Sequence, residues 1–223
     1  MERISTGAAK LDKLLGGGFP AGYNFVIAGK NDTDKSTLVH VLISNYIKSG
    51  GKCLYILTNR DPKNLKDEFE DAGIDYKKIS KKLEILDCFS WKAGDKDSVN
   101  IKGLTNLSIQ LEKLREKLGK KNTMEVFDTA SDFFINSRSD LVIQFLESSC
   151  ARVLKSGAIA IFIVDSGAQS EKDLAALESI TQGTIEIENK GEANILRVSK
   201  LIGLKHDNKW VKYKIGKGKL VFG

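Results

Sequence analysis

The stretch Ala28-Gly-Lys-Asn-Asp-Thr-Asp-Lys-Ser-Thr37 carries the strongest signal in this sequence. Apart from one position it follows the pattern G-x-x-x-x-G-K-[ST], in which a glycine-rich turn places consecutive backbone N–H groups around a phosphate. Gly29 fills the first position and Lys35-Ser36 closes the pattern, but Asp34 stands where the second glycine is expected. An aspartate there adds a side chain and a negative charge beside a polyanion unless the carboxylate turns away. The sequence therefore predicts a phosphate-binding loop that is altered at one position.

The residues on either side of this loop support the prediction. The apolar run 23–28 predicts a short buried strand, and residues 36–48 predict an apolar helix that ends at Ser49-Gly50-Gly51. A loop between a strand and a helix N-terminus directs free N–H groups and the positive end of the helix dipole toward an anion. The alternative is an ordinary strand-to-helix connection that contains Lys-Ser by chance.

Length and composition indicate a globular protein. With 223 residues and 41% hydrophobic content, we expect one domain that spans residues 1–223 and has a substantial core. No apolar run approaches the ~20 residues that a membrane-spanning helix needs. The first residues, Met1 to Ser5, contain no apolar signal segment. We therefore expect a cytoplasmic protein without membrane insertion.

The cysteines and histidines do not form a recognisable metal or disulfide pattern. Cys53, Cys88 and Cys150 are an odd number, widely spaced, and each lies in or beside an apolar run, which predicts reduced core residues. The two histidines, His40 and His206, are too few and too far apart for a metal cluster. We expect His40 to lie on the flank of its helix and outside any catalytic group.

The net charge of +6 comes mainly from lysine, which is concentrated in residues 77–82 and 200–219. Such a surface suits nucleic acid or another acidic partner. The alternative, which we favour, is a solvated surface rich in Lys and Glu, of the kind that thermophilic proteins carry.

Strands and helices alternate beyond the loop. The predicted strands are 52–58, 83–87, 124–128 and 158–164. The predicted helices are 62–72, 104–118, 138–155 and 171–180. Further short strands follow at 184–188, 195–199, 210–215 and 220–222. This order predicts an α/β fold: a mostly parallel central sheet flanked by helices, with right-handed crossovers and an antiparallel C-terminal extension or hairpin.

Motifs at both ends of the chain resemble a known family. Ile4-Ser-Thr-Gly7, Leu11-Asp12 and Leu14-Leu-Gly-Gly-Gly-Phe-Pro20 lead into the first strand, and the chain closes with Ser199-Lys-Leu-Ile-Gly-Leu-Lys-His206 and Tyr213-Lys-Ile-Gly-Lys-Gly-Lys-Leu-Val221. These stretches resemble the opening and closing segments of RecA/KaiC-like P-loop ATPases, in particular single-domain archaeal KaiC-like proteins. The resemblance implies a RecA-like fold, ATP or ADP with Mg²⁺ as cofactor, assembly into rings or filaments, and an archaeal source.

The resemblance also assigns roles to individual residues. The nucleotide-binding positions of the loop are Gly29, Asp34, Lys35, Ser36 and Thr37. Lys35 would pair with the β- and γ-phosphates, and the Ser36 hydroxyl would reach Mg²⁺. Asp128, at the end of strand 124–128, would be the second Mg²⁺ ligand, acting through water. Asp165 also follows an apolar run, but chain order assigns it to the next strand, where the family places a polar sensing residue.

The sequence departs from the family pattern after the second strand. The family places adjacent glutamates there, which activate the attacking water, but this chain has Asn59-Arg60. An amide cannot accept the proton of that water, and an arginine opposes a base beside it. Asp61, one position further on, is the remaining candidate for a catalytic base.

The C-terminal segment departs from the pattern as well. Lys200 matches the lysine that reaches the γ-phosphate bound by the neighbouring subunit, and His206 keeps its position. Ile202, however, stands where the family has an arginine, and isoleucine supplies no charge to the transition state.

Three functions are compatible with these features. We favour a degenerate RecA/KaiC-like nucleotide-binding protein, a weak or inactive ATPase that acts as a regulatory or assembly subunit with copies of itself or with a KaiC/RecA-like paralogue. The first alternative is a slow Mg²⁺-dependent ATPase that uses Asp61 or a residue from a partner as its base. The second alternative is a DNA-associated recombinase paralogue. We do not favour it, because no helix-turn-helix or basic glycine-rich loop with interleaved aromatic residues is present.

Overall fold

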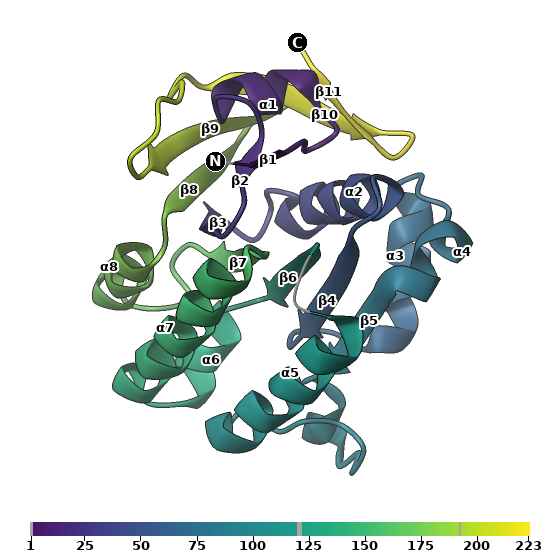
Figure 1. Cartoon of the computed structure of the whole chain (residues 1–223), viewed down its shortest axis with the longest axis vertical. Helices are drawn as coiled ribbons and strands as arrows, with labels where there is room; N and C mark the ends of the chain where they lie inside the picture. The colour runs from purple at the N-terminus through teal and green to yellow at the C-terminus, as the bar shows by residue number, and fades with distance from the viewer. Residues whose placement is uncertain (1, 120–121, 192) are drawn as a thin grey trace.

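The computed structural model describes residues 2–119, 122–191 and 193–223. Its main feature is a nine-stranded sheet with the order β11-β10-β9-β8-β3-β7-β6-β4-β5 (Figure 1). The strands are β3 (Asn24–Gly29), β4 (Lys52–Leu57), β5 (Leu83–Asp87), β6 (Thr123–Asp128), β7 (Ile159–Asp165), β8 (Gly183–Lys190), β9 (Ala193–Leu201), β10 (Val211–Gly216) and β11 (Lys219–Phe222). Strands β3 to β8 pair in parallel, and β9 to β11 are antiparallel. The predicted α/β fold with an antiparallel C-terminal extension is confirmed.

Helices cover both faces of this sheet (Figure 1). They are α1 (Ala9–Leu14), α2 (Lys35–Lys48), α3 (Leu65–Asp71), α4 (Tyr76–Ile79), α5 (Leu104–Leu118), α6 (Ser131–Asn136), α7 (Ser139–Ser156) and α8 (Glu171–Ile180). Helices α1 to α4 pack in one apolar cluster and α5 to α8 in the other. Along β3, Phe25 and Ile27 face the first cluster, whereas Val26 and Ala28 face the second. Because both faces of β3 are buried, this strand reads as a continuous apolar run.

The N-terminal motif fixes the start of the chain onto α2. Asp12 accepts hydrogen bonds from the Ser5 hydroxyl at 2.6 Å and from the backbone N–H and hydroxyl of Thr6, each at 2.7 Å. The Asn45 side chain of α2 donates to the Thr6 carbonyl at 2.9 Å. A Cβ on Gly7 would lie 2.4 Å from Asn45 Nδ2, and the φ of Gly7 is +76°, so this position requires glycine. The motif therefore positions the helix that follows the phosphate-binding loop.

The structure corrects several predicted elements. The predicted helix 62–72 begins as a 3₁₀ turn, Pro62–Asn64, before α3, because Asp61 accepts a hydrogen bond from Lys63 N and caps the turn. Strand β8 pairs in parallel with β3, and the antiparallel part of the sheet begins with the pairing of β8 and β9. The short helices α1, α4 and α6 were not predicted, since four to six residues are too few to show a helical period. Two short strands, β1 (Arg3–Ile4) and β2 (Phe19–Pro20), form a separate antiparallel pair.

The three cysteines are buried and unpaired, as the sequence predicted. Burial raises the pKa of the Cys150 thiol to about 12, which keeps this thiol protonated at neutral pH. In the part of the chain that the structure describes, no helix combines the length and the apolar character needed to span a membrane.

Strand order brings three segments to one edge of the sheet. The phosphate-binding loop follows β3, Asp128 ends β6, and Asn59-Arg60 follow β4. Strand β7 lies between β3 and β6, and β4 lies on the other side of β6. Ligands of open α/β sheets bind at the carboxyl ends of the strands. This edge is therefore the place to look for a functional site.

Candidate functional site

Asp34 keeps the backbone geometry of the glycine it replaces. It precedes α2 with φ 50° and ψ 29°, a left-handed conformation that favours glycine. Its carboxylate does not cap α2. Instead, Asp34 Oδ2 accepts a hydrogen bond from Asn194 Nδ2 of β9 at 3.1 Å. The first N–H groups of a helix have no partner within the helix. At the N-terminus of α2, beside the loop, Asp34 does not cap them.

Lys35 is buried and paired within the chain. Its Nζ donates to the Lys30 carbonyl at 2.5 Å and lies 3.0 Å from Asp165 Oδ1 at the end of β7. A carboxylate of this chain thus faces the ammonium group for which the sequence predicted a phosphate partner. A cavity of about 510 Å³ lies at this position. It is lined by Asn31, Asp32, Asp34, Lys35, Ser36, Thr37, Asn59, Asp128, Ile163 and Asp165.

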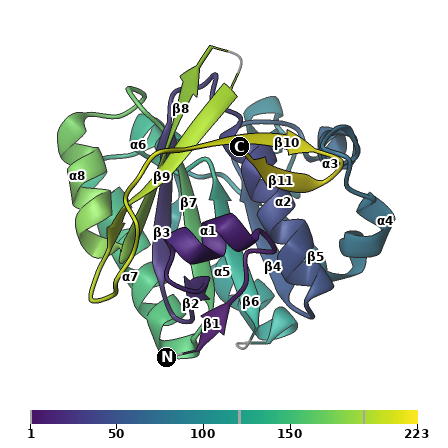
Figure 2. The same ribbon diagram turned by 90° about the horizontal axis from the view of Figure 1, so that it is seen from above.

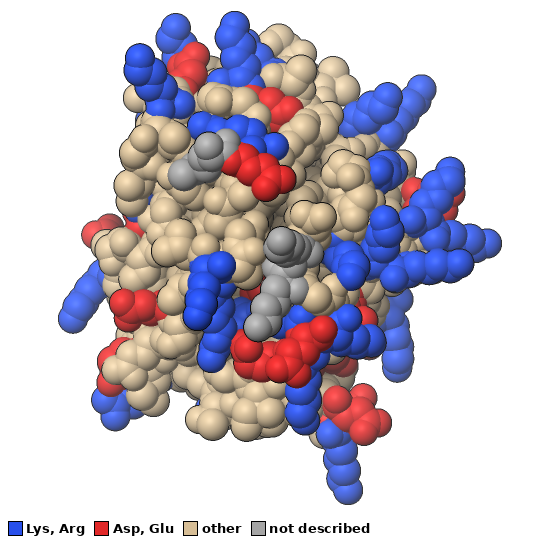
Figure 3. All heavy atoms as spheres, in the orientation of Figure 1, with Lys and Arg blue, Asp and Glu red and all other residues tan. Residues whose placement is uncertain are grey.

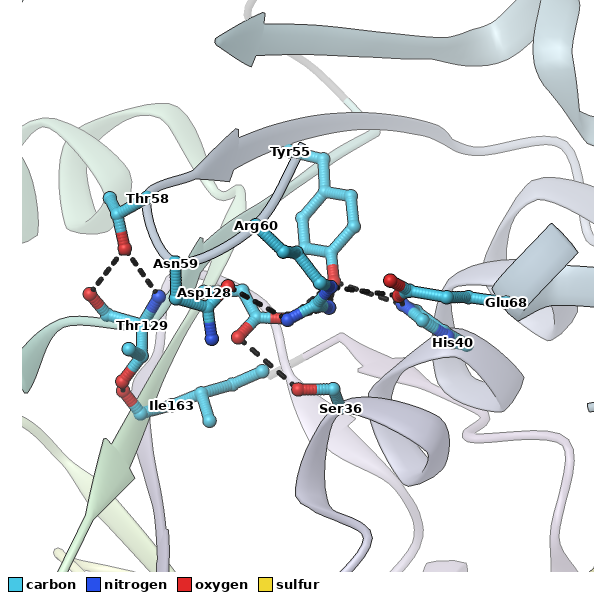
Figure 4. Close-up of polar contacts among 10 residues, drawn as sticks. All are labelled: Ser36, His40, Tyr55, Thr58, Asn59, Arg60, Glu68, Asp128, Thr129 and Ile163. Atoms are coloured by element: carbon cyan, nitrogen blue, oxygen red, sulfur yellow. Dashed lines mark hydrogen bonds and ion pairs between the residues drawn. The ribbon is translucent and has the colours of Figure 1, made fainter. Parts of the chain in front are cut away.

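The structure brings Ser36 and Asp128 together, as Figure 4 shows. Asp128 is fully buried, and its Oδ1 accepts a hydrogen bond from the Ser36 hydroxyl at 3.2 Å. Its Oδ2 accepts from the Tyr55 hydroxyl at 2.5 Å and from Arg60 Nη2 at 2.6 Å. Both oxygens of this carboxylate therefore have donors within the protein.

Arg60 connects Asp128 to helix α3. Its Nε donates to Glu68 Oε2 at 2.8 Å and its Nη1 to Asn59 Oδ1 at 2.8 Å, while Nη2 reaches both Tyr55 and Asp128 (Figure 4). The sequence indicated only that an arginine here opposes a base. It missed the ion pair with Asp128, although the ends of β4 and β6 must meet if these strands are neighbours.

His40 belongs to this network, so its predicted place on a helix flank is wrong. It is buried on α2, its ring stacks on Phe69 with centroids 4.2 Å apart, and its Nε2 lies 3.0 Å from the Tyr55 hydroxyl. Burial lowers the pKa of His40 to about 4; Asp128 opposes this shift and Arg60 adds to it. At neutral pH the ring is uncharged. Since the single Tyr55 proton goes to Asp128 and Arg60 donates to Tyr55, the His40 hydrogen is assigned to Nε2.

The residues at this edge do not fit a magnesium ion. Ser36 and Asp128 supply the oxygen atoms that Mg²⁺ prefers. However, Asp128 is fully buried, and a guanidinium 2.6 Å from its Oδ2 opposes a second positive charge there. Within residues 2–119, 122–191 and 193–223, no group of three or more His, Cys, Asp or Glu side chains is arranged to hold a metal. The carboxylate holds an arginine in the place where a metal ion was predicted.

The C-terminal residues of the predicted site lie apart from this network. Lys200 Nζ donates to the carbonyls of Glu178 and Thr181, the latter at 2.8 Å, at the end of α8. Burial lowers the pKa of Lys200. His206 Nδ1 lies 3.2 Å from the Leu204 carbonyl. Ile202 is 50% exposed.

Comparison with known proteins identifies the family. A family model described as "ATPase: KaiC" matches residues 4–222, nearly the whole chain. The chain belongs to this KaiC family of ATPases. The predicted RecA/KaiC-like membership is thus confirmed.

Individual relatives of this KaiC-family chain are distant. It is 25% identical over 222 residues to the circadian clock protein KaiC2 of Synechocystis sp.. The matched region covers 93% of this chain and 36% of KaiC2. It is 31% identical over 105 residues to the DNA repair and recombination protein RadB of Thermococcus sibiricus, covering 46% and 45% of the two chains. A KaiC-like protein of Pyrococcus horikoshii has the same fold, with a TM-score of 0.81, 18% identity and coverage of 100% and 99%. The chain thus spans only about a third to a half of these two curated relatives.

Proposed function

We propose that this KaiC-family chain is a nucleotide-binding subunit that does not hydrolyse ATP and acts by assembly, as a pseudo-ATPase. The ion pair between Arg60 Nη2 and Asp128 Oδ2, at 2.6 Å, carries this proposal. It lies just after β4, where the family resemblance implies a catalytic carboxylate. A general base must accept a proton, and the guanidinium has only donors. Asp61, the other candidate, uses its carboxylate to cap the turn at Lys63.

Two features support retention of a nucleotide. The Asp34 carboxylate bonds to Asn194 instead of capping α2, and Lys35 remains at the end of the loop. Two other features make the proposed binding weak. Lys35 must give up its ion pair with Asp165 to meet a phosphate. The cavity lining is also acidic, since its described residues include Asp32, Asp34, Asp128 and Asp165 against one lysine, Lys35. The proposed ligand is ATP or ADP.

Turnover assays with Mg-ATP test the absence of hydrolysis. We expect the native chain to be indistinguishable from Lys35→Ala, which supplies the background rate. The double variant Asn59→Glu, Arg60→Glu restores the carboxylates of the family pattern and tests whether they are the missing part. Hydrolysis by the native chain that disappears in Lys35→Ala would instead establish the slow ATPase.

The exposed Ile202 supports assembly with copies of this chain or a KaiC/RecA-like paralogue. It lies in the segment for which the resemblance implies contact with the neighbouring subunit. We expect light scattering after size-exclusion chromatography to detect an oligomer that Ile202→Asp dissociates. Ile109, on α5, is also 50% exposed and provides the matched control Ile109→Asp, which should leave the oligomer intact. A monomeric native chain that also fails to join a KaiC-family partner would contradict the assembly role.

A DNA-associated function is the second candidate, supported by the similarity to RadB and by the arrangement of lysines. Gly218 N, at the tip of the β10–β11 hairpin, donates to the Ala72 carbonyl at 2.8 Å, at the end of α3, the helix that precedes α4 (Figure 2). This contact brings two distant lysine-rich segments to the side of the molecule shown on the right of Figure 3. The exposed lysines are Lys77, Lys78, Lys81, Lys82, Lys212, Lys214, Lys217 and Lys219.

Electrophoretic mobility shifts test this candidate with single-stranded and duplex DNA at two salt concentrations. Binding through phosphate contacts weakens steeply as salt rises, because counterions are released. A shift at low salt that Lys77→Gln, Lys78→Gln, Lys81→Gln, Lys82→Gln removes would support a DNA function. No shift at low salt would eliminate it.

A further inference from the structure

We infer that Arg60 serves this site as a permanent cation in place of a divalent metal ion, so that ATP or ADP binds here without magnesium. The inference rests on the proposed retention of a nucleotide and adds how its charge is balanced. The family pattern implies a magnesium ion at Asp128, but hydrogen-bond donors of the protein already occupy both oxygens of this carboxylate.

The carboxylates at this site have cationic partners within the chain. Two carboxylates end neighbouring strands, Asp128 on β6 and Asp165 on β7, and each has one cationic partner in the chain. Lys35 lies 3.0 Å from Asp165, and Arg60 lies 2.6 Å from Asp128. One positive charge is therefore already present beside Asp128, and Arg60 shares it with Glu68. Because a guanidinium does not lose its proton in proteins, this charge persists at any physiological pH.

Neighbouring side chains hold Arg60 in place. Glu68, which accepts from Nε, lies on α3 between the buried residues Leu65 and Phe69. Tyr55 and Asn59 accept two further hydrogen bonds. The side chain is only 20% exposed. An arginine held from several sides loses little entropy when it meets a ligand, which is the advantage of a preorganised charge.

Arg60 lies close to the phosphate-binding loop. Arg60 lines a cavity of about 670 Å³ next to the 510 Å³ cavity at the loop, and both cavities are bounded by Asp34, Ser36 and Thr37. Four of its five N–H groups are engaged by Glu68, Asn59, Tyr55 and Asp128. The fifth, on Nη1, has no partner among the residues that the structure describes. It is a donor available to a phosphate oxygen.

Calorimetric titration of the native chain with ATP and ADP tests the inference, once in excess magnesium and once in EDTA. We expect affinities that agree within about threefold, since the site contains its own cation. For Arg60→Gln, which frees Asp128 from its ion pair, we expect affinity in magnesium to exceed affinity in EDTA by about tenfold or more. Arg138→Gln is the control, because Arg138 is exposed and pairs with Asp140 on the surface.

Each outcome separates the inference from the proposed function. Native affinity that rises about tenfold or more with magnesium overturns the inference, and so does the absence of nucleotide binding in both buffers. Absence of binding also removes the nucleotide-binding part of the proposed function, whereas magnesium-dependent binding leaves it intact. Neither result changes the assembly role, which light scattering tests independently. Conversely, Mg-ATP turnover that depends on Lys35 overturns the pseudo-ATPase proposal whatever the binding data show. The comparison of native protein in the two buffers needs no variant, so poor folding of Arg60→Gln leaves the test intact.

Discussion

Strand β6 carries two arginine–carboxylate pairs, one near each end. Glu125, in its first half, pairs with Arg115 of α5, and Asp128, its last residue, pairs with Arg60. The shortest N–O distance is 2.6 Å in both pairs, and both carboxylates are buried. The two pairs nevertheless differ in how the arginine is held and in what lies beside it.

Arg115 is part of a regular helix and, like Arg60, makes four side-chain hydrogen bonds. It makes two hydrogen bonds to Glu125, at 2.8 and 2.6 Å, and others to Glu112 and Ser149. Arg60 instead lies in the loop after β4, at the edge of the sheet where ligands bind, and makes a single hydrogen bond to Asp128. The same chemical pair therefore stabilises the fold at one end of β6 and occupies the predicted metal position at the other.

Removing the Arg115 pair should produce the largest effect. Arg115→Ala leaves Glu125 buried without its cation, which typically costs about 3–5 kcal/mol of unfolding free energy. Urea denaturation measures this loss. The double variant Arg115→Met, Glu125→Met removes both charges and should recover most of the stability, because apolar replacements of buried pairs are often neutral. A loss below about 1 kcal/mol for Arg115→Ala would contradict the structural role.

The stability of the network around Asp128 and Arg60 should depend on pH through His40. The pKa of His40 in the folded state is about 4, below the ordinary value of 6.5. Between these two pH values the unfolded chain binds a proton at His40 and the folded chain does not. The contribution of His40 to the free energy of unfolding is fully present above pH 6.5. It decreases as the pH falls to 4, by about 3 kcal/mol at most. Urea unfolding at pH 7 and 4.5 should show a smaller acid loss for His40→Gln than for the native chain. His206→Gln, at the other histidine, should behave like native; an unchanged acid loss in His40→Gln would contradict the buried neutral ring.

Tyr55 should have a smaller effect on the same network. Tyr55→Phe removes a donor to Asp128 and an acceptor for His40, and we expect a loss of about 1–2 kcal/mol in urea denaturation. Tyr213 provides the matched control, since it is equally buried but its hydroxyl has no partner in the described part of the chain. Tyr213→Phe should cost less than about 0.5 kcal/mol. Equal losses for the two variants would mean that the Tyr55 hydroxyl contributes nothing specific.

The sequence was sufficient to predict the fold because its strongest signals are local. The N-terminal motif specifies glycine at Gly7, which lies against Asn45 of α2, and a carboxylate at Asp12, which accepts hydrogen bonds from Ser5 and Thr6. Strand and helix periods also act locally. The predicted elements therefore agree with the structure within a few residues, apart from the start of α3.

The site was harder to predict because it depends on strand order and side-chain direction. Placing Ser36 near Asp128 needed only the family pattern. The ion pair of Arg60 with Asp128 required knowing that β4 and β6 are neighbours and that the loop after β4 turns back over β6. The position of Asp34 depended on Asn194, which is 160 residues away in the chain. No local pattern contains that information.

Substitution of Asp34, in the loop next to Arg60, should produce the smallest change in stability. Asp34→Gly relieves a left-handed aspartate but adds freedom to the unfolded chain, so we expect the unfolding free energy to change by less than about 1 kcal/mol. ATP affinity should rise several-fold, because one negative charge leaves the acidic cavity. Asp34→Asn removes the charge and keeps the side chain, and calorimetry of both variants separates the two causes. Equal gains in the two variants would mean that the weak binding comes from the negative charge of Asp34. A gain in Asp34→Gly alone would assign it to the Cβ, and unchanged affinity in both would mean that Asn194 already keeps this carboxylate away from the phosphates.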